Sequence, residues 1–79
     1  SAIATQKSGE PFTIYFIVNN IGEDDIATVE VMDGENIVGS KLMAVNGGDW
    51  RICKMDITLE GTGEHTISIG DLSAVITVE

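Results

Sequence analysis

The side chains that could support covalent chemistry are few in this sequence, and they centre on its single histidine, His65. A hydrolytic triad would need this imidazole, backed by a carboxylate, to activate a hydroxyl or thiol group. The candidates for that group are Ser40, Ser68, Ser73 and Cys53. No serine lies in a G-x-S-x-G elbow, and one histidine with one cysteine is too few for a tetrahedral zinc site. We therefore expect no enzymatic activity, and we expect His65 to hydrogen-bond a nearby loop carbonyl.

Acidic side chains on two successive loops are candidates for a calcium site. Glu23 stands beside two aspartates in the first loop, and the second loop follows about eight residues later. The candidate ligands are Asp24, Asp25, Asp33 and Glu35. Loops that bring carboxylate oxygens together can bind Ca²⁺, although the D-x-D-x-D-G spacing of an EF-hand loop is missing here. The alternative is two solvated acidic loops without a bound ion, and no other cofactor is expected.

Three bulky side chains are candidates for a contact surface. Trp50 is the only tryptophan, and it begins a segment in which it points away from the apolar positions. Tyr15 and Ile17 occupy the polar face of another segment. Aromatic faces contact both sugars and proteins, so these residues would form a patch for carbohydrate or protein binding. The alternative for Trp50 is a residue that covers the end of the domain.

The net charge of the chain argues against two classes of partner. Thirteen acidic residues face four basic ones, which gives a formal net charge of −9 over 79 residues. Nucleic-acid binding depends on basic side chains that displace counterions from phosphates, and this chain has no basic stripe. The same charge disfavours an anionic membrane surface, and no apolar run reaches the length of a membrane span. We therefore expect neither a nucleic-acid partner nor direct membrane insertion.

The elements that would position these residues are organised around residues 9–22, GEPFTIYFIVNNIG, which have the composition of a central β-strand. Successive strand side chains point to opposite faces. One face of this stretch is wholly apolar and carries Phe12, Ile14, Phe16 and Val18. We expect that face to be buried, because a slip of one residue would expose both phenylalanines. After the strand, Asn20 is placed to hydrogen-bond its own backbone two residues on.

The rest of the chain divides into short alternating segments, at residues 1–5, 26–32, 36–45, 50–59, 64–69 and 72–78, with a kink expected at Gly39. In residues 50–59 one face carries Cys53, Met55, Ile57 and Leu59, so we expect the cysteine to be a core residue. In the last segment the inward set is either Leu72, Ala74, Ile76 and Val78 or their neighbours. Turns about every eight to twelve residues, without a helical period, predict one domain that folds as an antiparallel β-sandwich of about seven strands in two sheets.

Turn motifs along the chain resemble those of a known family. Gly9-Glu10-Pro11 precedes the apolar strand, and Val18, Asn20 and Gly22 follow with the spacing V-x-N-x-G. The pattern continues with Asp33-Gly34, with Gly47-Gly48 and with Gly63-Glu64-His65-Thr66-Ile67. Over nearly its whole length the chain thereby resembles the CARDB domains, a cell-adhesion-related immunoglobulin-like family. The APHP and NEW3 modules open similarly.

The resemblance implies an immunoglobulin-like β-sandwich with a non-catalytic role. Its members would be adhesion or spacer modules of secreted or cell-surface proteins in bacteria or archaea, with other domains of the parent chain or surface proteins as partners. The start at Ser1, without a methionine, fits a fragment of such a longer chain. Two other roles stay open: a carbohydrate-binding accessory domain of a glycosidase, as the NEW3 likeness implies, and a domain of a surface filament such as an archaellum or pilus.

Overall fold

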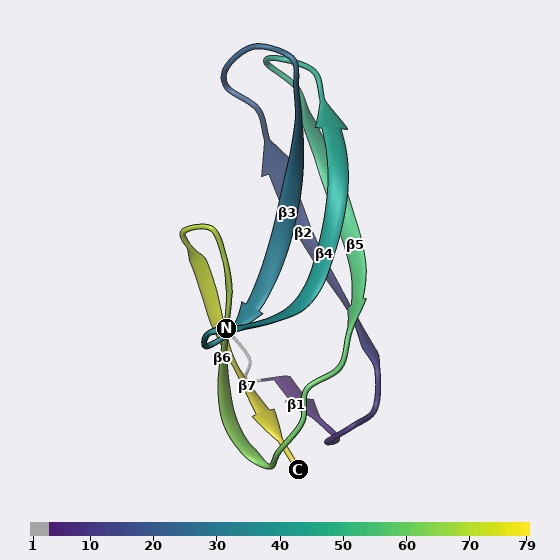
Figure 1. The fold of residues 1–79 in the computed structure, drawn as a ribbon, viewed down its shortest axis with the longest axis vertical. Helices are drawn as coiled ribbons and strands as arrows, with labels where there is room; N and C mark the ends of the chain where they lie inside the picture. The colour runs from purple at the N-terminus through teal and green to yellow at the C-terminus, as the bar shows by residue number, and fades with distance from the viewer. Residues whose placement is uncertain (1–3) are drawn as a thin grey trace.

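The computed structural model describes residues 4–79, which form seven β-strands and no helix (Figure 1). The strands are β1 (Ala4–Gln6), β2 (Phe12–Asn19), β3 (Asp25–Asp33), β4 (Asn36–Val45), β5 (Trp50–Ile57), β6 (Gly63–Ile69) and β7 (Leu72–Val78). The prediction of an all-β fold with about seven strands is confirmed. Of the expected first strand, residues 1–3 lie outside the described part of the chain.

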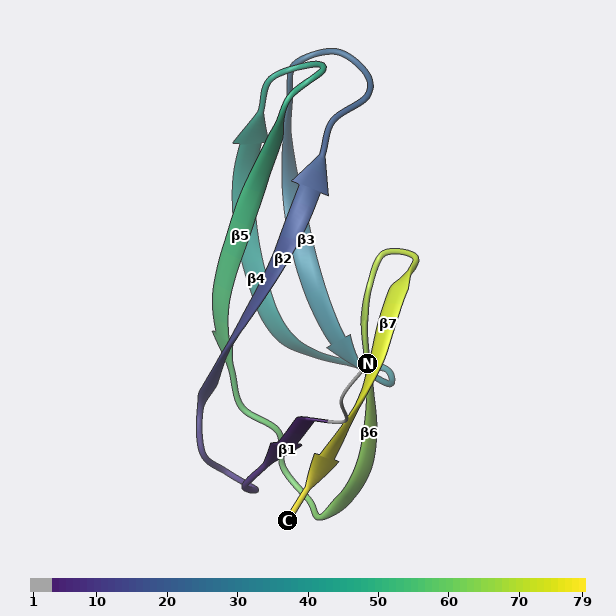
Figure 2. The same ribbon diagram turned by 180° about the vertical axis from the view of Figure 1, so that it is seen from behind.

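The strands form two sheets of unequal size. The larger sheet has the order β1-β7-β6-β3-β4, and the smaller one consists of β2 and β5 (Figure 2). Two sheets were predicted, and most neighbouring strands are antiparallel. However, β1 runs parallel to β7, with Ala4 opposite Ile76, so the prediction of a purely antiparallel fold is wrong at this edge. A strand of three residues carries too little pattern to indicate its partner.

Strand β2 is an edge strand, whereas its composition predicted a central one. It pairs with β5 from Phe12 opposite Ile57 to Asn19 opposite Trp50, and with no other strand among residues 4–79. The predicted face is confirmed, because the four apolar residues of β2 pack against the core while the residues between them are exposed. Alternation shows which face of a strand is buried, but it does not show how many strands flank it.

The core lies between the two sheets. Its buried side chains are Val31, Met43, Val45, Cys53, Met55, Ile57, Leu59, Ile67, Ile76 and Val78. The predicted inward face of β5 is confirmed, and Leu59 remains buried although the strand ends at Ile57. On β7, Ile76 and Val78 are buried but Leu72 and Ala74 are exposed, because they belong to the hairpin tip that projects away from the other strands (Figure 1).

Two-residue turns join β3 to β4 and β6 to β7. Gly34 and Gly70 occupy the first position of these turns with φ of 59° and 56°, and no residue other than glycine has a positive φ in the described chain. A positive φ at the first position alone is what a type II′ turn requires, and such turns match the twist of the strands they connect. The Asp33-Gly34-Glu35 hairpin predicted from the sequence is therefore present.

A β-bulge bends β4 where the kink was expected. Val31 lies opposite Gly39, but the next residue of β3, Met32, lies opposite Ile37, so Val38 has no partner in the ladder. Bulges of this kind bend a strand and increase its twist. Residues 25–31 of β3 pair with β4 alone, because β3 pairs with β6 only through Met32 and Asp33. The larger sheet is therefore only two strands wide along that part of β3.

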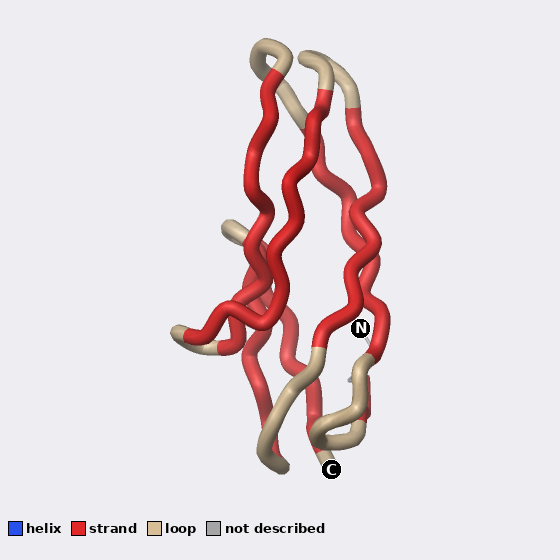
Figure 3. The backbone as a smooth tube through the Cα atoms, turned by 45° about the vertical axis from the view of Figure 1, so that its right-hand side comes forward, coloured by secondary structure: helices blue, strands red, loops and turns tan. Residues whose placement is uncertain are grey.

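The molecule is elongated, with extents of 41 × 23 × 19 Å. Figure 3 shows the loops gathered mainly at the two ends of the long axis. The β2–β3 and β4–β5 loops lie at one end, and the β1–β2 and β5–β6 loops lie at the other (Figure 1). Side chains near the start of β5 and side chains near the start of β6 therefore belong to separate regions of the surface.

Candidate functional site

The smaller sheet exposes a cluster of large side chains on its outer face, which we call the outer patch: Tyr15, Ile17, Trp50 and Ile52. In the β2–β5 register Ile17 lies directly opposite Ile52, and Trp50 lies diagonally from Ile17. Cross-strand neighbours at these positions are close enough for their side chains to touch. The structure thus brings together the three residues that the sequence nominated as a contact surface.

Exposure separates the outer patch from the core. Trp50 is 56% exposed and Tyr15 is 66% exposed, so more than half of each side chain is open to solvent. The inner residues of the same two strands pack on the larger sheet. Ile52 is the member that sequence reasoning left out, because only the strand register shows that it faces Ile17.

Polar residues flank the outer patch on the same face. Lys54 lies opposite Tyr15, and Asn19 lies opposite Trp50. At the far end, the Thr13 hydroxyl donates a hydrogen bond of 2.5 Å to an oxygen of the Asp56 carboxylate. The face is therefore an apolar strip with a polar border, the composition of a small recognition surface.

Asn20 positions the loop from which Trp50 emerges. Its side-chain amide donates to the carbonyls of Glu23 (2.6 Å) and Val45 (2.8 Å), and its side-chain oxygen accepts from the Gly22 N–H at 2.9 Å. The backbone carbonyl of Asn20 accepts from Gly48, and its N–H donates to Asp49. The expected bond two residues on is present, and the additional bonds join the β2–β3 and β4–β5 loops into one unit.

The acidic side chains that were candidates for a calcium site lie in two separate places. Asp24 and Asp25 stand at the start of β3, while Asp33 and Glu35 stand at its end. Nine residues of extended strand separate the two groups by about 26 Å at the usual rise per residue. One of the carboxylates is already used, since Asp24 accepts the Gly47 N–H at 2.7 Å. Within residues 4–79, no three His, Cys, Asp or Glu side chains are grouped closely enough to hold a metal ion.

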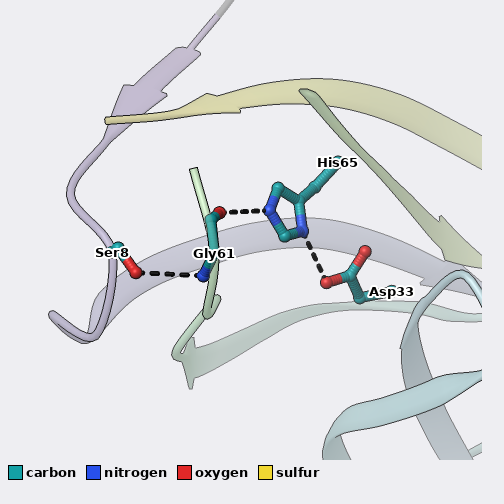
Figure 4. Close-up of polar contacts among 4 residues, drawn as sticks. All are labelled: Ser8, Asp33, Gly61 and His65. Atoms are coloured by element: carbon teal, nitrogen blue, oxygen red, sulfur yellow. Dashed lines mark hydrogen bonds and ion pairs between the residues drawn. The ribbon is translucent and has the colours of Figure 1, made fainter. Parts of the chain in front are cut away.

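His65 joins three parts of the chain, away from the end that carries the β2–β3 and β4–β5 loops. Its Nδ1 lies 2.6 Å from Oδ2 of Asp33, and its Nε2 lies 2.7 Å from the Gly61 carbonyl oxygen. The Gly61 N–H donates to the Ser8 hydroxyl at 3.0 Å (Figure 4). The ring therefore connects β6 with the β3–β4 hairpin and, through Gly61, with the β1–β2 loop. The expected bond to a loop carbonyl is present, and Asp33 is a partner that the sequence did not indicate.

The two contacts of His65 favour its charged form. A carbonyl oxygen and an ionised carboxylate only accept hydrogen bonds, so both contacts are satisfied only when both ring nitrogens carry protons. The hydrogen bond to Asp33, then the bond to Gly61, and finally the attraction of the Asp33 charge raise the pKa of His65 above 6.5, and partial burial opposes them. The side chains of His65 and Asp33 are 13% and 20% exposed, so solvent only partly screens this pair.

The candidate nucleophiles lie apart from the imidazole. Both ring nitrogens of His65 contact oxygen acceptors, and among residues 4–79 neither contacts a hydroxyl or a thiol. Cys53 is fully buried in the core, as predicted, and it makes no disulfide. In the described chain, no apolar helix has the length that a membrane crossing needs.

Comparison with known proteins adds no relative to this picture. No family model, no curated protein and no solved structure matches the chain. The strand order, the outer patch and the His65 pair are therefore the observations from which a function is inferred.

Proposed function

We propose that the chain is a non-catalytic immunoglobulin-like module, which serves for adhesion or as a spacer in a secreted or cell-surface protein. The strand order supports the fold in this proposal. With the strands named A, B, C, C′, E, F and G in chain order, the larger sheet has the order A-G-F-C-C′ and the smaller sheet is B-E. This distribution of the C, F and G strands against B and E is typical of immunoglobulin-like sandwiches. The turn motifs shared with CARDB domains support the same family and the location outside the cell.

The outer patch is the observation that carries the binding role. A two-stranded sheet needs only its inner face for the core, yet its outer face presents two aromatic and two isoleucine side chains to solvent. Tryptophan and tyrosine combine large contact area with a polar atom, which suits them to interfaces. The arrangement of His65 and Cys53 supports the non-catalytic part, because their polar atoms are engaged or buried.

Carbohydrate binding is a second candidate, and the exposed aromatic rings of Trp50 and Tyr15 favour it. Such a role would belong to an accessory domain beside a glycosidase. Sugars and proteins both pack on aromatic faces, so the structure of the outer patch fits either partner.

The single tryptophan offers a direct test, because all indole fluorescence comes from Trp50. A glycan array identifies any sugar that binds, and an attachment assay with the parent protein tests adhesion. For a bound glycan, titration should shift the Trp50 emission to shorter wavelength as the ring leaves water. Trp50→Ala should abolish binding in whichever assay is positive, and Leu42→Ala, at another exposed apolar site on the larger sheet, should preserve it.

The two candidates predict different results. Attachment by the parent protein without any glycan signal supports the adhesion role, and a glycan signal that depends on Trp50 supports the carbohydrate role. If Trp50→Ala preserves both attachment and glycan binding, the outer patch has no binding role. If Trp50→Ala instead unfolds the chain, the indole belongs to the core and the exposed position in this structure is wrong.

A further inference from the structure

The two long sides of the sandwich differ in how they are closed. Where β4 meets β5, the Lys41 ammonium group donates to the Lys54 carbonyl at 3.3 Å, and the Arg51 guanidinium group donates to the Ala44 carbonyl at 3.1 Å. Met55 fills the space over Gly39 so closely that a Cβ there would collide with its sulfur. On this side, long side chains and backbone contacts connect the sheets.

The opposite side is open. A hollow of about 300 Å³ lies between β2, β3 and the tip of the β6–β7 hairpin, and a second hollow of about 250 Å³ continues it along β2 toward β7. The hollows share the side chains of Phe16, Ile69 and Leu72, so they form one depression, which we call the seam groove. Val18 and Val29 complete its apolar floor at the β3 end.

The backbone beside the seam groove has an unpaired edge. Strand β3 pairs with β4 along its whole length, but its other edge pairs with β6 only at Met32 and Asp33. Over residues 25–31 that edge faces no strand of the described chain. In Figure 2 the β6–β7 hairpin diverges from this part of β3. An edge of free N–H and C=O groups beside an apolar groove is a template for an additional strand.

The charges around the seam groove select the kind of strand. Among residues 4–79, Glu30 is the only charged residue that lines the two hollows, and Asp25 lines a smaller hollow near the β2–β3 loop. In the part of the chain that the structure describes, no lysine or arginine lines any of these three hollows. The whole chain also carries a net charge of −9, which opposes the approach of a second copy. The rim therefore complements a basic partner and repels an acidic one.

We propose that the seam groove binds an extended, basic segment of a partner protein. The segment pairs with residues 25–31 of β3 on the edge opposite β4. It thereby adds a strand to the larger sheet where β6 does not reach β3. Its alternate apolar side chains pack on Phe16, Val29 and Leu72, and its lysine or arginine side chains lie near Glu30.

The seam groove and the outer patch adjoin along β2, because Tyr15 and Ile17 line the hollows as well. The two sites differ in their anchors, since the segment binds through the β3 backbone and the outer patch through Trp50.

A peptide titration tests the proposal. The probe is a peptide that alternates valine with lysine over the length of residues 25–31, and its matched control alternates valine with glutamate. NMR amide exchange of the folded chain should show new protection at residues 25–31 with the lysine peptide. Leu72→Ala should weaken binding about fivefold, as expected for loss of part of an apolar contact. Leu42 is also an exposed leucine but lies outside the seam groove, so Leu42→Ala should leave the affinity unchanged.

Charge reversal supplies a second, independent readout. Glu30→Lys should lower the affinity for the lysine peptide and raise the affinity for the glutamate peptide. The control Glu10→Lys makes the same change of net charge outside the seam groove, so it should leave the preference for the lysine peptide in place.

Several results would overturn the proposal. They are an absence of binding by both peptides, equal binding of both, or equal weakening by the two leucine variants. A dimer that protects residues 25–31 in the absence of peptide would identify a second copy as the occupant and would also overturn it.

Discussion

The His65 contacts predict a stability that declines with rising pH. In the folded chain the pKa of His65 is raised above 6.5 by Asp33 and Gly61, so the folded state binds the proton more tightly than the unfolded state does. The contribution of His65 is therefore fully present below about pH 6.5. It is lost as the pH rises through the higher pKa of the folded state.

The size of the effect follows from the two contacts. A hydrogen bond to a charged group contributes about 1.5–3 kcal/mol to stability. The side chains of His65 and Asp33 are partly exposed to solvent, so the two contacts of His65 together should contribute about as much as one such bond. His65→Gln should then lower the free energy of unfolding by about 1.5–3 kcal/mol at pH 6. A change of this size corresponds to roughly 6–24 °C in Tm for a domain of this length.

The assay is urea unfolding, followed by far-ultraviolet circular dichroism, at intervals from pH 5.5 to pH 9. Groups that titrate alike in the parent chain and in His65→Gln cancel in the difference between their unfolding free energies. His65 is the only histidine, so the pH dependence that remains in this difference reports its titration. We expect that difference to shrink as the pH rises. Asp33→Asn keeps an acceptor but removes the charge, so it should reduce the pH dependence as well. A difference that is constant with pH, or that grows with pH, would refute the assignment of a charged His65.

Two further predictions concern packing. Leu59→Ala removes most of a side chain that is 1% exposed, so it should lower the free energy of unfolding by about 2–5 kcal/mol. Leu42 is 68% exposed, so Leu42→Ala should change this free energy by less than about 0.5 kcal/mol. Equal effects of the two variants in chemical denaturation would contradict the core assignment. Gly47→Ala places a Cβ against the backbone carbonyl of Gly22, and a backbone oxygen cannot move aside as a flexible side chain can. The variant should therefore lower the free energy of unfolding by about 1–3 kcal/mol. An unchanged Tm would show that the β2–β3 and β4–β5 loops do not pack as described.

Local pattern was sufficient for the existence of the strands and for the buried faces of β2 and β5. The alternation in β5 predicted that Cys53, Met55, Ile57 and Leu59 face inward, and all four are buried. Turn chemistry was equally informative at Asn20, whose bond to the Gly22 N–H follows from the preference of an asparagine side chain for its own backbone. These features depend on residues close together in the sequence.

The features that sequence reasoning missed depend on distant residues. Nothing in β2 indicates that β5 is its sole neighbour among residues 4–79, and nothing in β3 indicates that β6 pairs with two of its residues only. Asp33 and His65 are 32 positions apart, so their contact required the β3–β6 pairing to be known. The separation of the candidate calcium ligands also depends on tertiary arrangement, since the length of β3 lies between the two acidic loops.

The layered arrangement itself is tested most directly by solvent paramagnetic relaxation enhancement, measured by NMR on the side chains with an inert, soluble spin label. The account predicts strong enhancement for the outer patch and weak enhancement for Val31, Cys53 and Leu59. Weak enhancement at Trp50 and Ile52, together with strong enhancement at Cys53, would place the opposite face of β5 inward and contradict the account.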